Sequence, residues 1–173
     1  MDARVRLLAF LLGFPLVAAT AQADPAPPRA LRVGVSWDHL DRRDGGPRDG
    51  ASAYVAFRQA LADDWDAWVR VSWGGLPRPG SRPADLLCAA AGVALVLDAA
   101  DWTPALHVGA GYLGSVATGD LPPDGAALAG LTLDWRPHPR VQVGLLAEAR
   151  IPFRSYRRMP LATSLGLHAA LTF

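Results

Sequence analysis

The chain has 173 residues, of which 51% are hydrophobic and 19% charged, and its 17 basic against 16 acidic residues leave a formal net charge of +1. This length corresponds to one domain, and so apolar a composition with so little net charge excludes an intrinsically disordered protein. The balanced charge provides no general attraction for a nucleic acid, and no run near ~20 apolar residues predicts a transmembrane helix in the mature chain.

The first 23 residues have the pattern of a secretory signal. Two arginines precede an apolar stretch at 7–19, and Ala21-Gln22-Ala23 then supplies the small residues of a cleavage site. We expect cleavage after Ala23, because the stretch is too short to span a bilayer as a helix; a retained N-terminal anchor is the alternative. The proline-rich residues 24–29 are predicted to form an extended lead-in.

From residue 30 onwards, apolar and polar residues alternate, and this period of two is typical of β-strands. In the first segment, Leu31, Val33 and Val35 alternate with Arg32 and Gly34. The pattern recurs along the chain and predicts eight strands, each of about ten residues. These strands cover 31–39, 53–59, 65–73, 87–97, 102–112, 127–135, 141–151 and 165–173.

The connections between the predicted strands alternate between short and long. Three are turns of three residues, and four are longer and rich in Gly, Pro and Arg. An even number of strands with short turns at one end and long loops at the other predicts an all-β fold, an eight-stranded antiparallel up-and-down transmembrane β-barrel over residues 30–173. The turns are 62–64, 99–101 and 137–139, and the loops are 41–50, 75–85, 117–125 and 154–161.

The placement of the aromatic residues predicts which face of the strands points outward. A soluble barrel would turn its apolar face inward, but the opposite face here is dominated by small residues that suit a narrow lumen. Apolar-face aromatics also gather at both strand ends, as a bilayer with two interfaces selects, whereas Trp68 lies on the polar face. The predicted belts are Trp65, Trp102, Trp135 and Phe173 beside the short turns, and Trp37, Trp73 and Phe153 beside the long loops.

The last strand carries the most specific feature of the sequence. Residues 164–173 end in Phe173, with Leu171 and other apolar residues at alternate positions before it. Residues 30–173 resemble the family of small outer-membrane β-barrels, the eight-stranded OmpA/OmpX-like or porin-family type, although His168 replaces the glycine usual at that place. The resemblance implies the outer membrane of a Gram-negative cell envelope, with turns and both termini in the periplasm and loops outside. It also implies insertion by the barrel-assembly machinery, which reads Leu171 and Phe173.

The polar face carries charges of both signs at inward positions. Isolated buried charges cost several kcal/mol each, so we expect the arginines and acids to pair as a lumen charge network. A rearranging network that passes protons or small ions is the alternative. The arginines are Arg32, Arg58, Arg70, Arg140 and Arg150, and the acids are Asp38, Asp66, Asp98, Asp134 and Glu148.

The last long loop carries a cluster of arginines without an acid nearby. Arg154, Arg157 and Arg158 lie within five residues, and guanidinium groups match phosphate oxygens in two-pronged contacts. We therefore predict contact with the phosphates of lipopolysaccharide, with an ordinary solvated loop as the alternative.

Catalytic and metal-binding patterns are missing from the sequence. A lipid A-modifying barrel enzyme would need a base beside a serine, as in a His-x-Ser motif. None of the four histidines has a serine two residues after it. Four dispersed histidines and the single Cys88 offer no metal-ligand spacing, so no cofactor is expected. We predict a closed, monomeric, non-enzymatic outer-membrane barrel with a structural or surface-interaction role; a small-solute or ion-permeable porin comes second and a lipid A-modifying enzyme third.

Overall fold

The structure, a computed structural model, describes residues 28–43, 48–77, 83–97, 101–115 and 121–173. The predicted signal at 1–23 and most of the lead-in at 24–29 lie outside these residues. The described part contains eight strands and one short 3-10 helix, η1. Their bounds are β1 Arg29–Asp41, β2 Arg48–Ala62, β3 Trp65–Leu76, β4 Ala84–Val96, β5 Trp102–Gly114, β6 Asp124–His138, β7 Val141–Pro152, η1 Ser155–Arg157 and β8 Leu161–Thr172.

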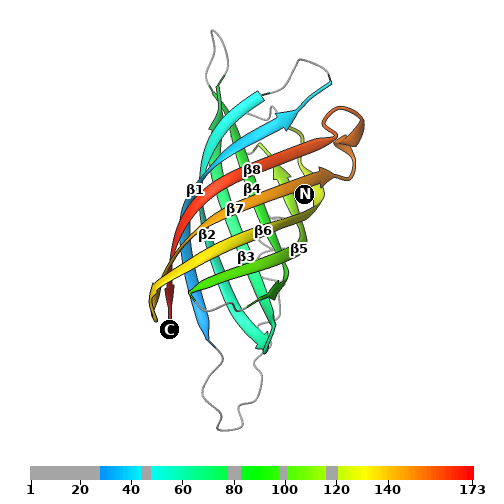
Figure 1. Cartoon of the computed structure of the whole chain (residues 1–173). Helices are drawn as coiled ribbons and strands as arrows, with labels where there is room; N and C mark the ends of the chain where they lie inside the picture. The colour runs from blue at the N-terminus through cyan, green and yellow to red at the C-terminus, as the bar shows by residue number, and fades with distance from the viewer. Residues whose placement is uncertain (1–27, 44–47, 78–82, 98–100, 116–120) are drawn as a thin grey trace, which may run out of the picture.

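The eight strands form one closed barrel in chain order, and every neighbouring pair is antiparallel (Figure 1). The barrel closes between β8 and β1, where the backbones of Arg29 and Phe173 exchange two hydrogen bonds of 3.1 and 2.9 Å. The C-terminus lies beside the β6–β7 connection, at the lower end of Figure 1. The predicted eight-stranded up-and-down barrel is therefore confirmed. We call this lower end the turn end and the opposite one the loop end.

Several strand limits differ from those predicted. The strands contain 12 to 15 residues, because they continue into the predicted loops. The turn predicted at 137–139 is wrong: β6 runs through His138, and its register against β7 shifts between Trp135 and His138. Such an irregularity tolerates Pro137, which has no N–H to give to the ladder. The turn at 62–64 is confirmed at Asp63-Asp64, whereas 98–100 lie outside the described residues.

The two faces of the wall have the orientation that the alternation predicted. Val35 and Leu131 on the apolar face are 60% and 49% exposed on the outside of the barrel. Arg32 and Asp134 on the polar face are 7% and 0% exposed inside it. The soluble-barrel alternative is thus excluded, since a barrel in water would not turn its hydrocarbon outward and its charges inward. Among the described residues, no helix is long and apolar enough to cross a membrane.

Large inward side chains fit into the lumen because glycines lie beside them on the neighbouring strands. Trp68 packs over Gly92 and Gly109, where an added Cβ would lie 2.9 and 2.7 Å from its ring. Tyr54 packs in the same way over Gly34, where an added Cβ would meet its hydroxyl at 2.7 Å. An eight-stranded barrel has little interior space, so these close approaches require the absence of a side chain.

Candidate functional site

The lumen near the turn end holds a group of charges around Asp134, which we call the Asp134 cluster. The Asp134 carboxylate receives a hydrogen bond from Arg32, lies 2.6 Å from His168 Nε2 and 3.7 Å from Arg58. Arg58 in turn pairs with Asp66. These five side chains come from β1, β2, β3, β6 and β8, so the cluster ties strands on opposite sides of the barrel together.

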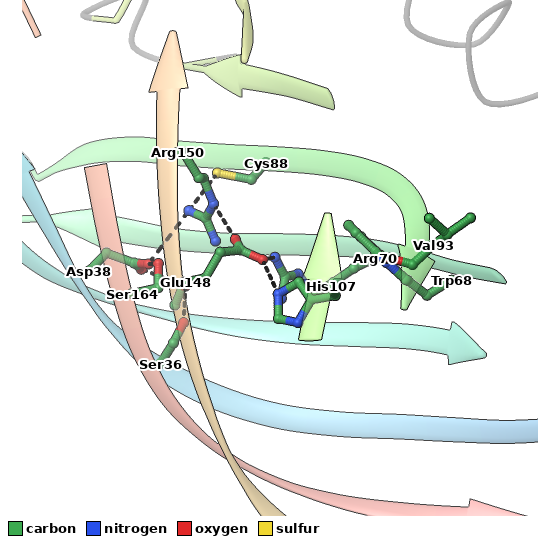
Figure 2. A network of polar contacts seen from close by, with 11 residues as sticks. Ser36, Asp38, Trp68, Arg70, Cys88, Val93, His107, Glu148, Arg150 and Ser164 are labelled. Carbon is green, nitrogen blue, oxygen red and sulfur yellow. Dashed lines mark hydrogen bonds and ion pairs between the residues drawn. The ribbon is translucent and has the colours of Figure 1, made fainter. Parts of the chain in front are cut away.

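A second group, the Glu148 cluster, lies further toward the loop end (Figure 2). Glu148 accepts hydrogen bonds from Arg70 and, at 2.6 Å, from Arg150, and it lies 3.1 Å from His107 Nε2. Its carboxylate is fully buried. Burial of a carboxylate in a lumen of low polarity requires such multiple donors, because a lone charge there would be strongly destabilising.

Arg150 extends this second cluster toward the loop end (Figure 2). Its Nη1 lies 3.8 Å from the Asp38 carboxylate and 3.3 Å from Cys88 Sγ. Asp38 also accepts hydrogen bonds from Ser52 at 2.6 Å and Ser164 at 2.5 Å. Cys88 is thus a buried thiol against a guanidinium, at the inward position that its place in the alternation predicted.

Of the ten charged residues proposed for the lumen, the structure brings eight together in two groups, and Asp38 joins the second of them through Arg150. Arg32, Arg58, Asp66 and Asp134 belong to the Asp134 cluster. Arg70, Glu148 and Arg150 belong to the Glu148 cluster. The placement of Arg140 in the lumen is wrong, because it lies exposed in the turn after β6, and Asp98 lies outside the described residues.

Aromatic and histidine side chains complete the lumen between the charges. The Arg70 guanidinium lies between two rings, 5.7 Å from the centre of Tyr54 and 5.6 Å from that of Trp68. Trp68 donates its indole N–H to the Val93 carbonyl at 3.1 Å and meets His107 edge-on. His107 and His168 also lie in the lumen, and their carboxylate partners on other strands carry no sequence signal.

An apolar plug fills the lumen at the loop end, and sequence analysis missed it. Its side chains come from six strands and from the loops after β5 and β7, and Leu40, Leu76 and Leu113 are at most 1% exposed. A signal existed: at the loop ends of the strands, the inward positions change from polar residues to leucine. The plug consists of Leu40, Leu76, Ala84, Leu86, Cys88, Leu113, Leu121, Ala126, Met159 and Ala162.

The arginine-rich loop is held firmly against the loop end of the barrel. Asp124 at the start of β6 accepts backbone hydrogen bonds from Arg154 at 2.9 Å and Ser155 at 2.6 Å. The Arg43 N–H donates to the Arg158 carbonyl at 2.9 Å, which connects this loop to the end of β1. The side chains of Arg154, Arg157 and Arg158 are exposed, so their guanidinium groups stand on a fixed backbone and face outward.

The residues proposed for the aromatic belts all lie on the outer face, at the two ends of the barrel. At the turn end, the Trp102 and Trp135 rings are 6.5 Å apart on adjacent strands, and Phe173 is 69% exposed. At the loop end, Phe153 is 62% exposed and directly precedes Arg154. The exposed rings that form these belts are Trp37, Trp65, Trp73, Trp102, Trp135, Phe153 and Phe173.

The described histidines are engaged by partners other than serine. His39 lies 2.8 Å from Asp49, His107 contacts Glu148, and His168 contacts Asp134. Within the described residues, no three or more His, Cys, Asp or Glu side chains are grouped to hold a metal ion. The carboxylates of the two lumen clusters are therefore matched by arginine and histidine partners.

No protein-family model matches the sequence, and neither does any curated protein. The fold is similar to that of Neisserial surface protein A, with a TM-score of 0.69 at 10% identity over 84% of this chain and 97% of that one. Ail, the attachment invasion locus protein of Yersinia pestis, gives 0.61 at 13% identity over 86% of this chain and all of its own. The outer membrane protein OprG from Pseudomonas aeruginosa gives 0.55 at 9% identity over 86% and 96%.

Ail has also been solved with the heparin analogue sucrose octasulfate, and that structure gives a TM-score of 0.54 at 14% identity over 86% of this chain and all of the other. At such low identities these similarities establish the fold. The chain has the fold of the small eight-stranded outer-membrane β-barrels, which confirms the resemblance inferred from its alternation and its last strand.

Proposed function

We propose that this chain is a closed, non-enzymatic outer-membrane barrel that presents arginines to lipopolysaccharide phosphates at the cell surface. The outer wall is apolar between two belts of exposed rings, which is the surface that a bilayer requires. The turn end and the C-terminus then face the periplasm and the loops face outward. The role is that of a surface anchor, and the barrel acts as a monomer inserted by the barrel-assembly machinery.

The observation that carries this proposal is the position of the arginine-rich loop directly above the loop-end belt. Phe153 marks the interface of the hydrocarbon, and Arg154 follows it in the chain. Asp124 and Arg43 hold the loop backbone in place. The loop therefore loses little conformational entropy when a phosphate binds. Phosphates of an outer-leaflet lipid lie at this same level, where guanidinium forks match them. Ail, which shares the fold, has been solved with a sulfated ligand, so a barrel of this kind can bind polyanions.

The closed state is supported by the filling of the lumen. The apolar plug occupies the loop end, and the two ion-pair clusters cross the barrel below it. A porin would need a continuous water path through the lumen. The plug and the ion pairs interrupt such a path, and this favours a closed barrel over the porin alternative.

Replacing Arg154, Arg157 and Arg158 by alanine together tests the function. In lipid vesicles, the unmodified protein should bind lipid A that carries its phosphates, and binding should weaken steeply as salt is raised. The triple variant should lose most of this binding. A double variant, Arg29→Ala with Arg140→Ala, removes charge from the turn end and should bind normally. Equal binding by the triple variant, or equal binding to dephosphorylated lipid A, would overturn the proposal.

A further inference from the structure

The lumen contains a small cavity that is lined by residues of both the Asp134 and the Glu148 clusters and by several apolar side chains. Its volume is about 40 Å³, and its walls include three guanidinium groups, one phenol and two imidazoles. A site for one water molecule needs ~10–15 Å³ by this measure, so the space suits solvent rather than an organic ligand. The titratable lining residues are Arg32, Arg58, Arg70, Tyr54, His107 and His168, and Thr132 adds a hydroxyl.

Three buried polar atoms on the wall of this cavity have no hydrogen-bond partner within the protein. They are Arg32 Nε, Tyr54 Oη and His168 Nδ1, and their residues are 7%, 5% and 6% exposed. A buried polar group without a partner costs ~1–3 kcal/mol, and native lumens rarely contain three of them together.

The strand register places these three residues side by side on the inner wall. Gly34 on β1 pairs with Tyr54 on β2 and with His168 on β8, and Arg32 lies two residues away on β1 facing the same side. Gly34 has no side chain, and the Tyr54 hydroxyl lies over it. Tyr54 and His168 therefore flank Gly34 on the inner wall, and Arg32 is their neighbour.

The chemistry of the three atoms determines which small ligand fits. Asp134 lies 2.6 Å from His168 Nε2; a neutral His168 ring that donates from this nitrogen presents a lone pair on Nδ1. Arg32 Nε can only donate, whereas the Tyr54 hydroxyl can donate or accept. A ligand must then both accept from Arg32 and donate to His168. A halide cannot donate, and it would face the Nδ1 lone pair.

We propose that this cavity is a structural water site, in which one water molecule bridges Arg32 Nε, Tyr54 Oη and His168 Nδ1. The water accepts hydrogen bonds from Arg32 and Tyr54 and donates one to His168, which gives it the three bonds that buried waters usually make. It joins the Asp134 cluster to the Arg70 side of the Glu148 cluster, and it makes solvent a part of the closed lumen. This site does not depend on the arginine-rich loop.

The direction in which one substitution changes the stability of the barrel tests the site. With the water bound, Tyr54→Phe removes a hydrogen bond and should raise the unfolding equilibrium constant, the ratio of unfolded to folded protein, by about fivefold. In a dry cavity the same change removes an unpaired hydroxyl and should stabilise the barrel, which would overturn the proposal. Tyr156→Phe is the matched control, because Tyr156 is 51% exposed in η1 and should change nothing.

Two further measurements keep the test decisive if the variant folds poorly. A high-resolution crystal structure of the unmodified protein should show solvent density within hydrogen-bond distance of all three atoms. Clear density for the three side chains with no solvent peak between them would refute the site. Unfolding in chloride and in gluconate at equal ionic strength should coincide. Stabilisation by chloride that disappears in Tyr54→Phe would identify an anion site instead.

Discussion

The two ends of the lumen solve the same packing problem with opposite chemistry. Toward the turn end, the inward side chains are charged and meet oppositely charged partners across the barrel, as Glu148 meets Arg70. At the loop end, the inward side chains are leucines, and they meet hydrocarbon from the loops, such as Leu121 and Met159. The difference teaches that the alternation of the wall sets only which side chains point inward. What they contact decides whether they form an ion pair or a seal.

The physical costs of disturbing the two ends differ accordingly. A buried charge that loses its partner keeps its desolvation penalty without any compensating attraction. A truncated leucine leaves a cavity, and the free energy that this costs depends on how far the surrounding side chains close it. The charged region should therefore govern the stability of the barrel, and the plug should govern its permeability.

The largest effect is expected from Glu148→Ala, which leaves both Arg70 and Arg150 without their shared carboxylate. We expect a loss of ~3–5 kcal/mol in the free energy of unfolding, measured by urea titration and the heat-dependent shift in gel mobility. Asp66→Ala is the control from the other cluster, because that side chain is 15% exposed and its arginine retains Asp134. Its loss should be clearly smaller. Equal losses would contradict the view that depth in the lumen sets the cost.

The plug is tested by Leu40→Ser combined with Leu113→Ser. Both side chains are at most 1% exposed, and replacing them by a smaller side chain opens space in the plug. In planar bilayers the unmodified protein should show no large steady conductance. The double variant should show more frequent openings, because water can enter the loop end of the lumen once two plug leucines are replaced by serines.

Leu131→Ser serves as the permeability control, because its side chain lies on the outer face. It should leave the conductance unchanged. Large, stable currents from the unmodified protein would sink the closed-barrel proposal and favour the porin alternative.

A third test contrasts the outer face with the lumen. Arg introduced at Val69 or Leu131, near the middle of an outward strand face, should cost ~2–4 kcal/mol in a bilayer. Gln59→Arg, near the turn end of β2, should be mild. Spin labels at positions 69 and 131 should be reached by lipid-soluble quenchers, and protection from them would contradict a lipid-facing wall.

The smallest effect on the folded barrel is expected from Phe173→Ser. The Phe173 side chain is 69% exposed, and its backbone makes the two bonds to Arg29, so the refolded variant should unfold almost like the unmodified protein. In cells, however, the variant should be secreted and reach the outer membrane in lower amounts. Unchanged outer-membrane levels would argue against a C-terminal assembly signal.

The sequence by itself determined the strands, their order and the two faces of the wall, because the period of two is local to each strand. Trp68 was correctly placed inward for this reason. The irregularity after Trp135 broke the same rule, since a shift in register depends on the partner strand and carries no local pattern.

Only the tertiary structure decided which inward side chains are partners across the lumen. The partners of Glu148 lie on β3, β5 and β7, and they follow from the stagger accumulated around the closed barrel, which no single strand encodes. The same holds for the meeting of Arg32, Tyr54 and His168 around Gly34. The plug needed the loops to fold back over the strand ends before its leucines had anything apolar to contact. Alternation is a property of neighbouring residues, whereas pairing across a lumen is a property of the closed ring.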